Sequence, residues 1–88
     1  MRKKTNLTDQ YIQALSEEIK ERRQEAGISQ DDLADRAKVH RTYISLIERR
    51  SCNFSMQIFF RIAEALDVEP LELMQTAGKA VGSKKKKS

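Results

Sequence analysis

The stretch GISQDDLADRAKVHRTYISLIERR, residues 27–50, decides how this chain folds. Gly27 supplies the left-handed conformation that ends one helix, and Ser29 is a preferred N-cap residue for the next. The apolar or small residues that follow have the spacing of two short helices joined by a tight turn: Leu33, Ala34, Ala37, Val39, Ile44 and Ile47. An alanine at position 34 lets two helix backbones approach closely. The pattern predicts a helix that begins after Ser29 and a second over 41–49, crossing it at a steep angle.

Helical spacing continues on both sides of this stretch. Thr8 or Asp9 can cap a first helix that Gly27 ends, with apolar positions at Ile12, Leu15 and Ile19. Ser55 can cap a fourth helix, whose apolar residues are Phe59, Ile62, Ala63 and Leu66. Pro70 opens a fifth at the first helical position, where its missing N–H costs nothing. Five short helices with brief connections predict a compact all-α domain.

Charge is distributed unevenly along the 88 residues, which carry a formal net charge of +4. Residues 1–7 carry three positive charges and residues 78–88 carry five, so residues 8–77 have a net charge of −4. We expect a flexible basic arm over 1–7, one domain over 8–77 and a disordered Lys-rich tail over 78–88, whether that tail is native or added. Such ends are either solvated tails or a source of sequence-independent attraction to nucleic acid. Within the domain, residues 40–50 hold three arginines against one glutamate.

The composition argues against several classes of protein. A chain of this length buries about 60% of the surface that its unfolded form exposes, which favours a binding module over an enzyme with an elaborate cavity. No run of about 18 apolar residues occurs, so we expect no membrane span, no secretory signal and a cytoplasmic location. Cys52 and His40 are the only residues of their kinds, so no disulfide, metal site or cofactor is expected. With no Gly-rich phosphate loop and no nucleophile beside a base, the sequence predicts no catalytic activity.

The helix expected over residues 41–49 has two different faces. Ile44 and Ile47 lie on one side, and the other side presents Arg41, Thr42, Ser45, Leu46 and Arg49. The major groove of B-DNA, about 12 Å wide, admits one helix, and there an arginine can bond to guanine O6 and N7 while hydroxyls bond to several base edges. We therefore expect this face to read bases, with Arg41 near the N-terminal end as the first reader. Leu46 either covers a thymine methyl group or packs against a neighbour.

Taken together, the two helices form a helix-turn-helix, and residues 15–75 resemble the lambda-repressor-like (Cro/repressor) family of DNA-binding domains. The resemblance rests on the stretch quoted above followed by IAEALDVEPLEL at residues 62–73. It implies a five-helix domain of a bacterial or phage transcriptional regulator, with base contacts from Arg41, Thr42 and Ser45. Lys38 and Arg50 stand where the family usually has glycine. A left-handed conformation at a non-glycine residue costs about 1 kcal/mol, so both positions are tolerable.

Contacts to the DNA backbone should position the reading helix. The family holds a phosphate at the position of Gln30, where backbone N–H groups at a helix start and a side-chain amide converge. His40 stands where a helix cap is needed and is expected to be either a turn residue or a neighbour of a phosphate, rather than a catalytic base. The hydroxyl of Tyr43 can reach a phosphate while its ring packs. Arg50 and Asn53, in the following loop, are further candidates.

The expected partners are double-stranded DNA and a second copy of the chain. A single short helix reads only a few base pairs, so modules of this kind work as two-fold dimers on half-sites about one helical turn apart. The candidates for the dimer surface are the surplus apolar residues Phe54, Ile58, Phe60, Leu71 and Met74. The same side chains can instead close the core of the monomer.

Residues 41–50 together with Asn53 look most similar to small controller proteins of restriction–modification systems, which are compact dimers without a separate effector domain. Bound dimers would block RNA polymerase or, placed beside it, recruit it through an exposed surface. The alternative is a protein-interaction module, antitoxin-like or an adaptor, that turns the polar helix face to a protein. Arg41, Thr42 and Ser45 argue against this alternative, because the core of a protein interface is depleted in charge and richer in aromatic residues.

Overall fold

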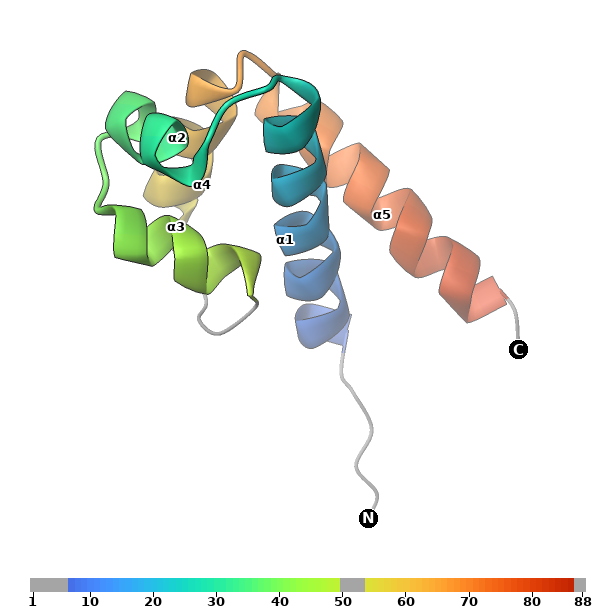
Figure 1. Cartoon of the computed structure of the whole chain (residues 1–88). Coiled ribbons are helices and arrows are strands. Elements are labelled where there is room, and N and C mark those ends of the chain that lie inside the picture. Colours follow the sequence, from blue (N-terminus) through green and yellow to red (C-terminus); the bar gives the residue numbers. More distant parts are fainter. Residues whose placement is uncertain (1–6, 50–53, 87–88) are drawn as a thin grey trace.

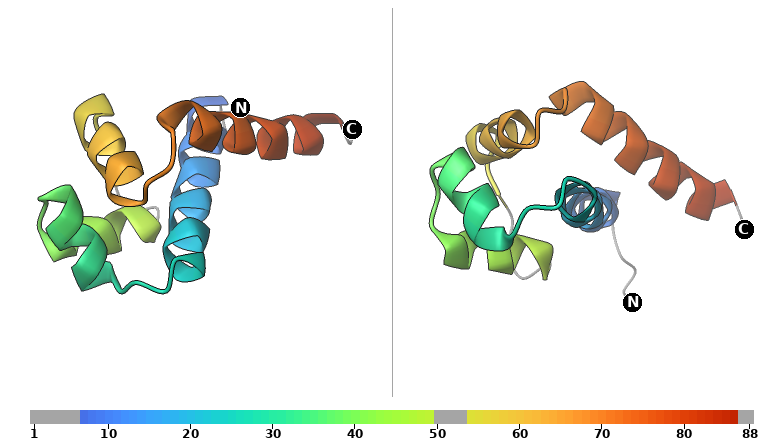
Figure 2. Two further views of the ribbon diagram at one scale, coloured as in Figure 1. Left: turned by 90° about the horizontal axis from the view of Figure 1, so that it is seen from above. Right: turned by 45° about the horizontal axis from the view of Figure 1, so that its top comes forward.

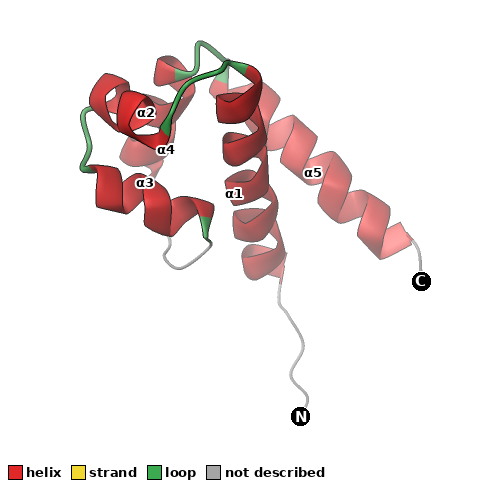
Figure 3. Cartoon of the chain, in the orientation of Figure 1, coloured by secondary structure: helices red, strands yellow, loops and turns green. Residues whose placement is uncertain are grey.

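The computed structural model describes residues 7–49 and 54–86, with side chains described as far as Gly82. These residues form five helices, α1 (Leu7–Glu25), α2 (Gln30–Ala37), α3 (Arg41–Glu48), α4 (Met56–Ala65) and α5 (Pro70–Lys86) (Figure 1; Figure 3). No strand occurs in this part of the chain. The predicted all-α architecture of five helices is confirmed.

Helix α1 stands between α5 on one side and the group formed by α2, α3 and α4 on the other (Figure 1; Figure 2). Helix α2 packs against α3 and α4, and α5 packs against α1 and α4. The main core cluster contains eight buried residues, Ile19, Leu33, Ala34, Ala37, Ile44, Ile47, Ile62 and Leu66. A smaller cluster joins α4 to α5 through Phe59, Ala63 and Leu73. Every core position predicted from residues 27–50 is therefore buried or, for Val39, packed against the buried cluster.

Helices α1, α2 and α4 end in the same way. Just beyond each helix one residue adopts the left-handed conformation: Gly27 (φ 73°), Lys38 (φ 58°) and Asp67 (φ 60°). The residue after it donates its N–H to the carbonyl five residues earlier and packs its apolar side chain against the core: Ile28, Val39 and Val68. This motif satisfies carbonyl groups that a helix end leaves free and turns the chain towards the next helix. The expectation for Lys38 is confirmed, whereas Arg50 lies outside the described residues.

Replacing Lys38 with glycine should raise the free energy of unfolding by about 0.5–1 kcal/mol, because glycine adopts a left-handed conformation without the steric cost of a Cβ atom. Urea denaturation followed by circular dichroism measures the change. Arg36→Gly is the control, since residue 36 lies inside α2, where glycine should lower the free energy of unfolding by about 1 kcal/mol. A loss of stability in both variants would contradict the expected strain at Lys38.

The two terminal helices differ from expectation at their outer ends. Helix α5 continues to Lys86, so residues 78–86 are helical where a disordered tail was expected. Buried residues at four-residue intervals extend the apolar stripe of α5 along α1: Leu73, Ala77 and Val81. Lysine, which occupies four of residues 78–86, is also a good helix former. Helix α1 begins at Leu7, which places Thr8 and Asp9 in its first turn rather than at its cap.

Candidate nucleic-acid interface

Helix α3 begins at Arg41 because His40 caps it. The backbone of His40 is extended (φ −72°, ψ 142°), and its Nδ1 atom accepts a hydrogen bond from the N–H of Thr42 at 3.1 Å. The predicted capping position of His40 is therefore confirmed, while its contact with a phosphate stays a prediction. The cap fixes Arg41 as the first residue of the helix, at the end that recognition helices direct to base edges.

The two faces of α3 differ in burial as predicted. Ile44 and Ile47 are fully buried in the main core cluster. The exposed residues of the helix and its C-cap are Arg41, Thr42 and Arg49, and the half-buried ones are Tyr43, Ser45 and Leu46. Nη1 of Arg49 donates a hydrogen bond to Oγ of Ser45 at 3.0 Å. Two of the expected base readers are thus held against each other along one side of the helix.

Arg41 also contacts the neighbouring helix α2. Its Nε atom lies 3.0 Å from Oδ1 of Asp31, and the two side chains are 62% and 73% exposed. An ion pair this exposed contributes little to stability. The sequence alone does not predict this pair, because the two residues meet only through the crossing of α2 and α3.

The other end of α3 carries a buried ion pair that was also not predicted from the sequence. The side chain of Glu48 is only 2% exposed and accepts hydrogen bonds from Nε and Nη2 of Arg23, on α1, at 2.8 and 3.1 Å. Gln30 donates a further bond to Oε1 of Glu48 at 3.0 Å, and Arg23 donates one to the carbonyl of Ile28 at 2.9 Å. The network joins α1, α2 and α3. Its signal in the sequence is that Glu48 follows Ile44 by four residues, which places it on the buried face.

The start of α2 has the geometry of a capping box. Oγ of Ser29 accepts the N–H of Asp32 at 3.0 Å, and the Asp32 carboxylate accepts the N–H of Ser29 at 3.2 Å. Gln30 lies at this helix start as expected, with its amide bonded to Glu48. A phosphate contact here would therefore use backbone N–H groups and the second amide hydrogen of Gln30. The remaining backbone candidates, Arg50 and Asn53, lie outside the described residues.

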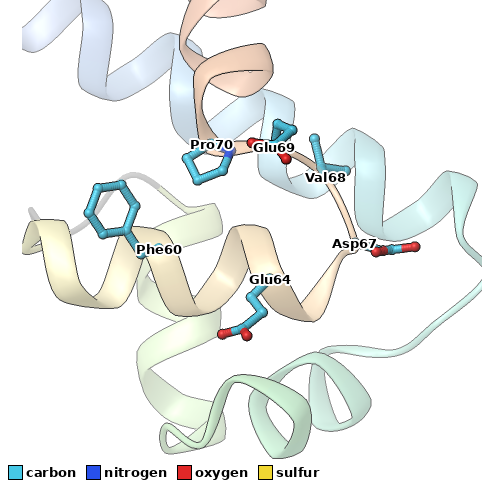
Figure 4. A pocket seen from close by; sticks show the side chains of 6 residues that line it. All are labelled: Phe60, Glu64, Asp67, Val68, Glu69 and Pro70. Carbon is cyan, nitrogen blue, oxygen red and sulfur yellow. The ribbon is translucent and has the colours of Figure 1, made fainter.

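The five apolar residues expected at the dimer surface divide into two groups. Phe54 and Ile58 are half-buried and pack against the core. The other three are exposed by 47%, 63% and 43%: Phe60, Leu71 and Met74. An open hollow of about 420 Å³ lies between α4 and α5, lined by Phe60, Glu64, Asp67, Val68, Glu69 and Pro70 (Figure 4). Core closure thus accounts for the first group, and a role in dimerisation stays a prediction for the second.

The polar face of α3 and the hollow lined by α4 and the start of α5 carry opposite charges. The face of α3 carries arginines, whereas the hollow carries the three exposed carboxylates of Glu64, Asp67 and Glu69.

Within the described residues, no three potential metal ligands form a group. No helix there is apolar over a length that could span a membrane.

The sequence of this chain matches the model of a known protein family. A family model described as helix-turn-helix, of the Cro/C1 type, matches residues 19–73. The control protein C.BamHI of Bacillus amyloliquefaciens is 43% identical over 49 residues, which make up 56% of this chain and 60% of that protein. This chain therefore matches less than two thirds of that relative.

Solved structures of controller proteins share the fold. The restriction–modification controller protein C.AhdI from Aeromonas hydrophila gives a TM-score of 0.68 at 34% sequence identity, covering 70% of this chain and 94% of that one. The controller protein C.Esp1396I, solved as a tetramer in complex with its natural 35-base-pair operator, gives a TM-score of 0.76 at 34% identity. That match covers 81% of this chain and 93% of the other.

Proposed function

The chain belongs to the Cro/C1-type helix-turn-helix family, and we propose that it is a sequence-specific DNA-binding transcriptional regulator that places α3 in the major groove. The observation that carries the proposal is the division of α3 into two faces. Ile44 and Ile47 anchor the helix in the core, which leaves a polar face with two arginines turned to solvent. Such a face matches the hydrogen-bonding edges of bases better than it matches an apolar core.

Each part of the site has a role in this proposal. The residues that contact bases are Arg41, Thr42, Ser45, Leu46 and Arg49. The residues that contact the sugar–phosphate backbone are Gln30, His40, Tyr43, Arg50 and Asn53. Contacts of the second kind fix the position of α3, while contacts of the first kind select the sequence. The basic residues near both ends of the chain would add affinity that does not depend on sequence and that falls with salt.

The proposed assembly is a homodimer on a pseudo-palindromic operator. One helix of eight residues covers too few base pairs to define a site, so two copies are needed. The controller C.Esp1396I supports this proposal, because it was solved as a tetramer on its operator. The proposed dimer surface consists of the exposed apolar residues Phe60, Leu71 and Met74 together with the half-buried Phe54 and Ile58.

The proposed cellular role is that of a restriction–modification controller in the cytoplasm. The names of the relatives, which are controller proteins, support this role. A bound dimer would block RNA polymerase or, when placed beside it, recruit it. The proposal includes no catalytic step. The similar proteins are named as controllers, and the polar side chains of α3 are proposed to contact DNA.

The experiment that tests this function is selection from a pool of randomised DNA duplexes at near-physiological salt, with sequencing of the bound fraction. Enrichment of an inverted repeat with centres about one helical turn apart is the expected result. An unbiased pool would overturn the proposal and favour the protein-interaction module. The polar face of α3 would then be tested against proteins.

Replacing Arg41 with alanine should cost about 1–3 kcal/mol of binding free energy on the selected operator and relax the base preference at one position in each half-site. Competition binding on operators that differ at single positions measures both effects. Arg61→Ala is the matched control, since it removes the same charge from an exposed site on α4. Equal losses from Arg41→Ala on all operators would remove Arg41 from the base-reading residues.

A further inference from the structure

The first two residues of α2 contact opposite ends of the reading helix. Gln30 donates to Glu48, the last residue of α3, and Asp31 pairs with Arg41, the first. The two neighbouring aspartates have different contacts: Asp32 takes part in the capping box of α2, whereas the carboxylate of Asp31 pairs with Arg41 on α3. Among the described residues, Asp31 is the only carboxylate within ion-pair distance of Arg41.

The contact uses one particular edge of the guanidinium group. Oδ1 of Asp31 lies against Nε of Arg41, while Nη1 and Nη2 have no acceptor within the described part of the chain. Those two terminal nitrogens are the ones that bond in parallel to O6 and N7 of guanine. An exposed ion pair favours one set of orientations of the arginine without fixing it, so the side chain loses somewhat less conformational freedom when it binds.

We propose that Asp31 is a positioning residue that sets the sequence specificity of Arg41. This inference rests on the proposed function, in which Arg41 reads a base. The Asp31 carboxylate holds the guanidinium through Nε and directs its terminal nitrogens to guanine. The same carboxylate lies at the DNA-facing side of the domain and repels phosphates, so it weakens complexes in which Arg41 makes only backbone contacts. Both effects raise the ratio of specific to non-specific affinity.

The test compares two duplexes, the selected operator and the same operator with the guanine of Arg41 replaced. Asp31→Asn keeps the shape of the side chain and removes its charge. We expect the affinity ratio between the two duplexes to fall about two- to fivefold, the range typical of an exposed ion pair, while affinity for random duplex rises. In the Arg41→Ala background, Asp31→Asn should leave the ratio unchanged, because Asp31 acts through Arg41.

Asp35→Asn is the matched control, since Asp35 is also exposed on α2 and makes no ion pair within the described residues. It should raise the affinity of both duplexes without changing their ratio. Circular dichroism establishes that each variant is folded at the temperature of the binding assay.

The outcomes distinguish this inference from the function on which it rests. Equal changes of the ratio in Asp31→Asn and Asp35→Asn would reduce the effect to general charge and overturn the inference. A normal ratio in Asp31→Asn beside a lowered one in Arg41→Ala would also overturn it, while the proposed function stands. Failure of Arg41→Ala to relax any position would remove base reading by Arg41, and the inference would fall with it.

Discussion

Replacing Arg23 with alanine is expected to remove about 3–5 kcal/mol from the free energy of unfolding, because it leaves the buried carboxylate of Glu48 without its cation. Arg23 makes two hydrogen bonds to that carboxylate, whose side chain is 2% exposed, and one to the carbonyl of Ile28. The donor that remains, the amide of Gln30, is neutral. A small domain has a total stability of about 5–15 kcal/mol, so the loss is a large part of it. Urea denaturation of both proteins at the same pH measures the difference.

The neighbouring residue provides the control. Arg22 pairs with Glu18 at 2.7 Å and with Glu72 at 3.1 Å, and its hydrogen bonds to both raise the pKa of its guanidinium. The Glu72 side chain is 54% exposed, so water can replace the arginine there. The Glu18 side chain is 13% exposed, against 2% for Glu48, so Arg22→Ala should cost less stability than Arg23→Ala. Similar losses in Arg22→Ala and Arg23→Ala would show that burial of Glu48 does not determine the effect.

A double substitution separates the charge from the packing. In Arg23→Met with Glu48→Met, neither charge is buried and both sites keep side chains of similar length. Replacing a buried ion pair by apolar residues is often neutral for stability, whereas removing one partner is not. We therefore expect the double variant to be more stable than Arg23→Ala alone. A double variant no more stable than Arg23→Ala would show that the ion pair stabilises the fold more than apolar side chains at the same two positions do.

Features set by local chemistry could be predicted from the sequence. The caps Ser29, His40 and Ser55 lie where the sequence placed them, because a cap depends on a side chain and the backbone two or three residues further on. The left-handed conformation at Lys38 was implied by the resemblance to the lambda-repressor-like family, which usually has glycine at this position. The burial of Ile44 and Ile47 followed from helical periodicity.

Features set by the crossing of helices could not be predicted in this way. The pairs Arg23–Glu48 and Asp31–Arg41 join residues on different helices, and their distances depend on crossing angles that apolar spacing leaves open. From the sequence, Glu48 entered only the charge count of residues 40–50, although its position on α3 is inward. The length of α5 was missed for a related reason, since the lysines near its end obscured the stripe that continues to Val81.

Replacing Ile47 with alanine is expected to lower the free energy of unfolding by about 2–5 kcal/mol. Ile47 is fully buried in the main core cluster, so its truncation leaves a cavity between α3 and the helices that hold it. Leu46 is the matched control one residue earlier on the same helix, and it is only half-buried. Leu46→Ala should cost about 1 kcal/mol of stability, in proportion to the smaller apolar area that it buries. Thermal and urea denaturation of both variants measure the contrast.

For affinity to the selected operator, we expect the opposite order, with a larger loss in Leu46→Ala than in Ile47→Ala. At a temperature where both are folded, Ile47→Ala keeps every side chain of the polar face, so each folded molecule should retain most of its affinity. Leu46→Ala removes an apolar side chain from that face and should lose affinity at a single A·T pair if Leu46 covers a thymine methyl group. Losing affinity evenly at all positions would instead identify Leu46 as a packing residue. A stable Ile47→Ala would be the more serious result, because the proposed function needs one face of α3 fixed in the core to hold the other in the groove.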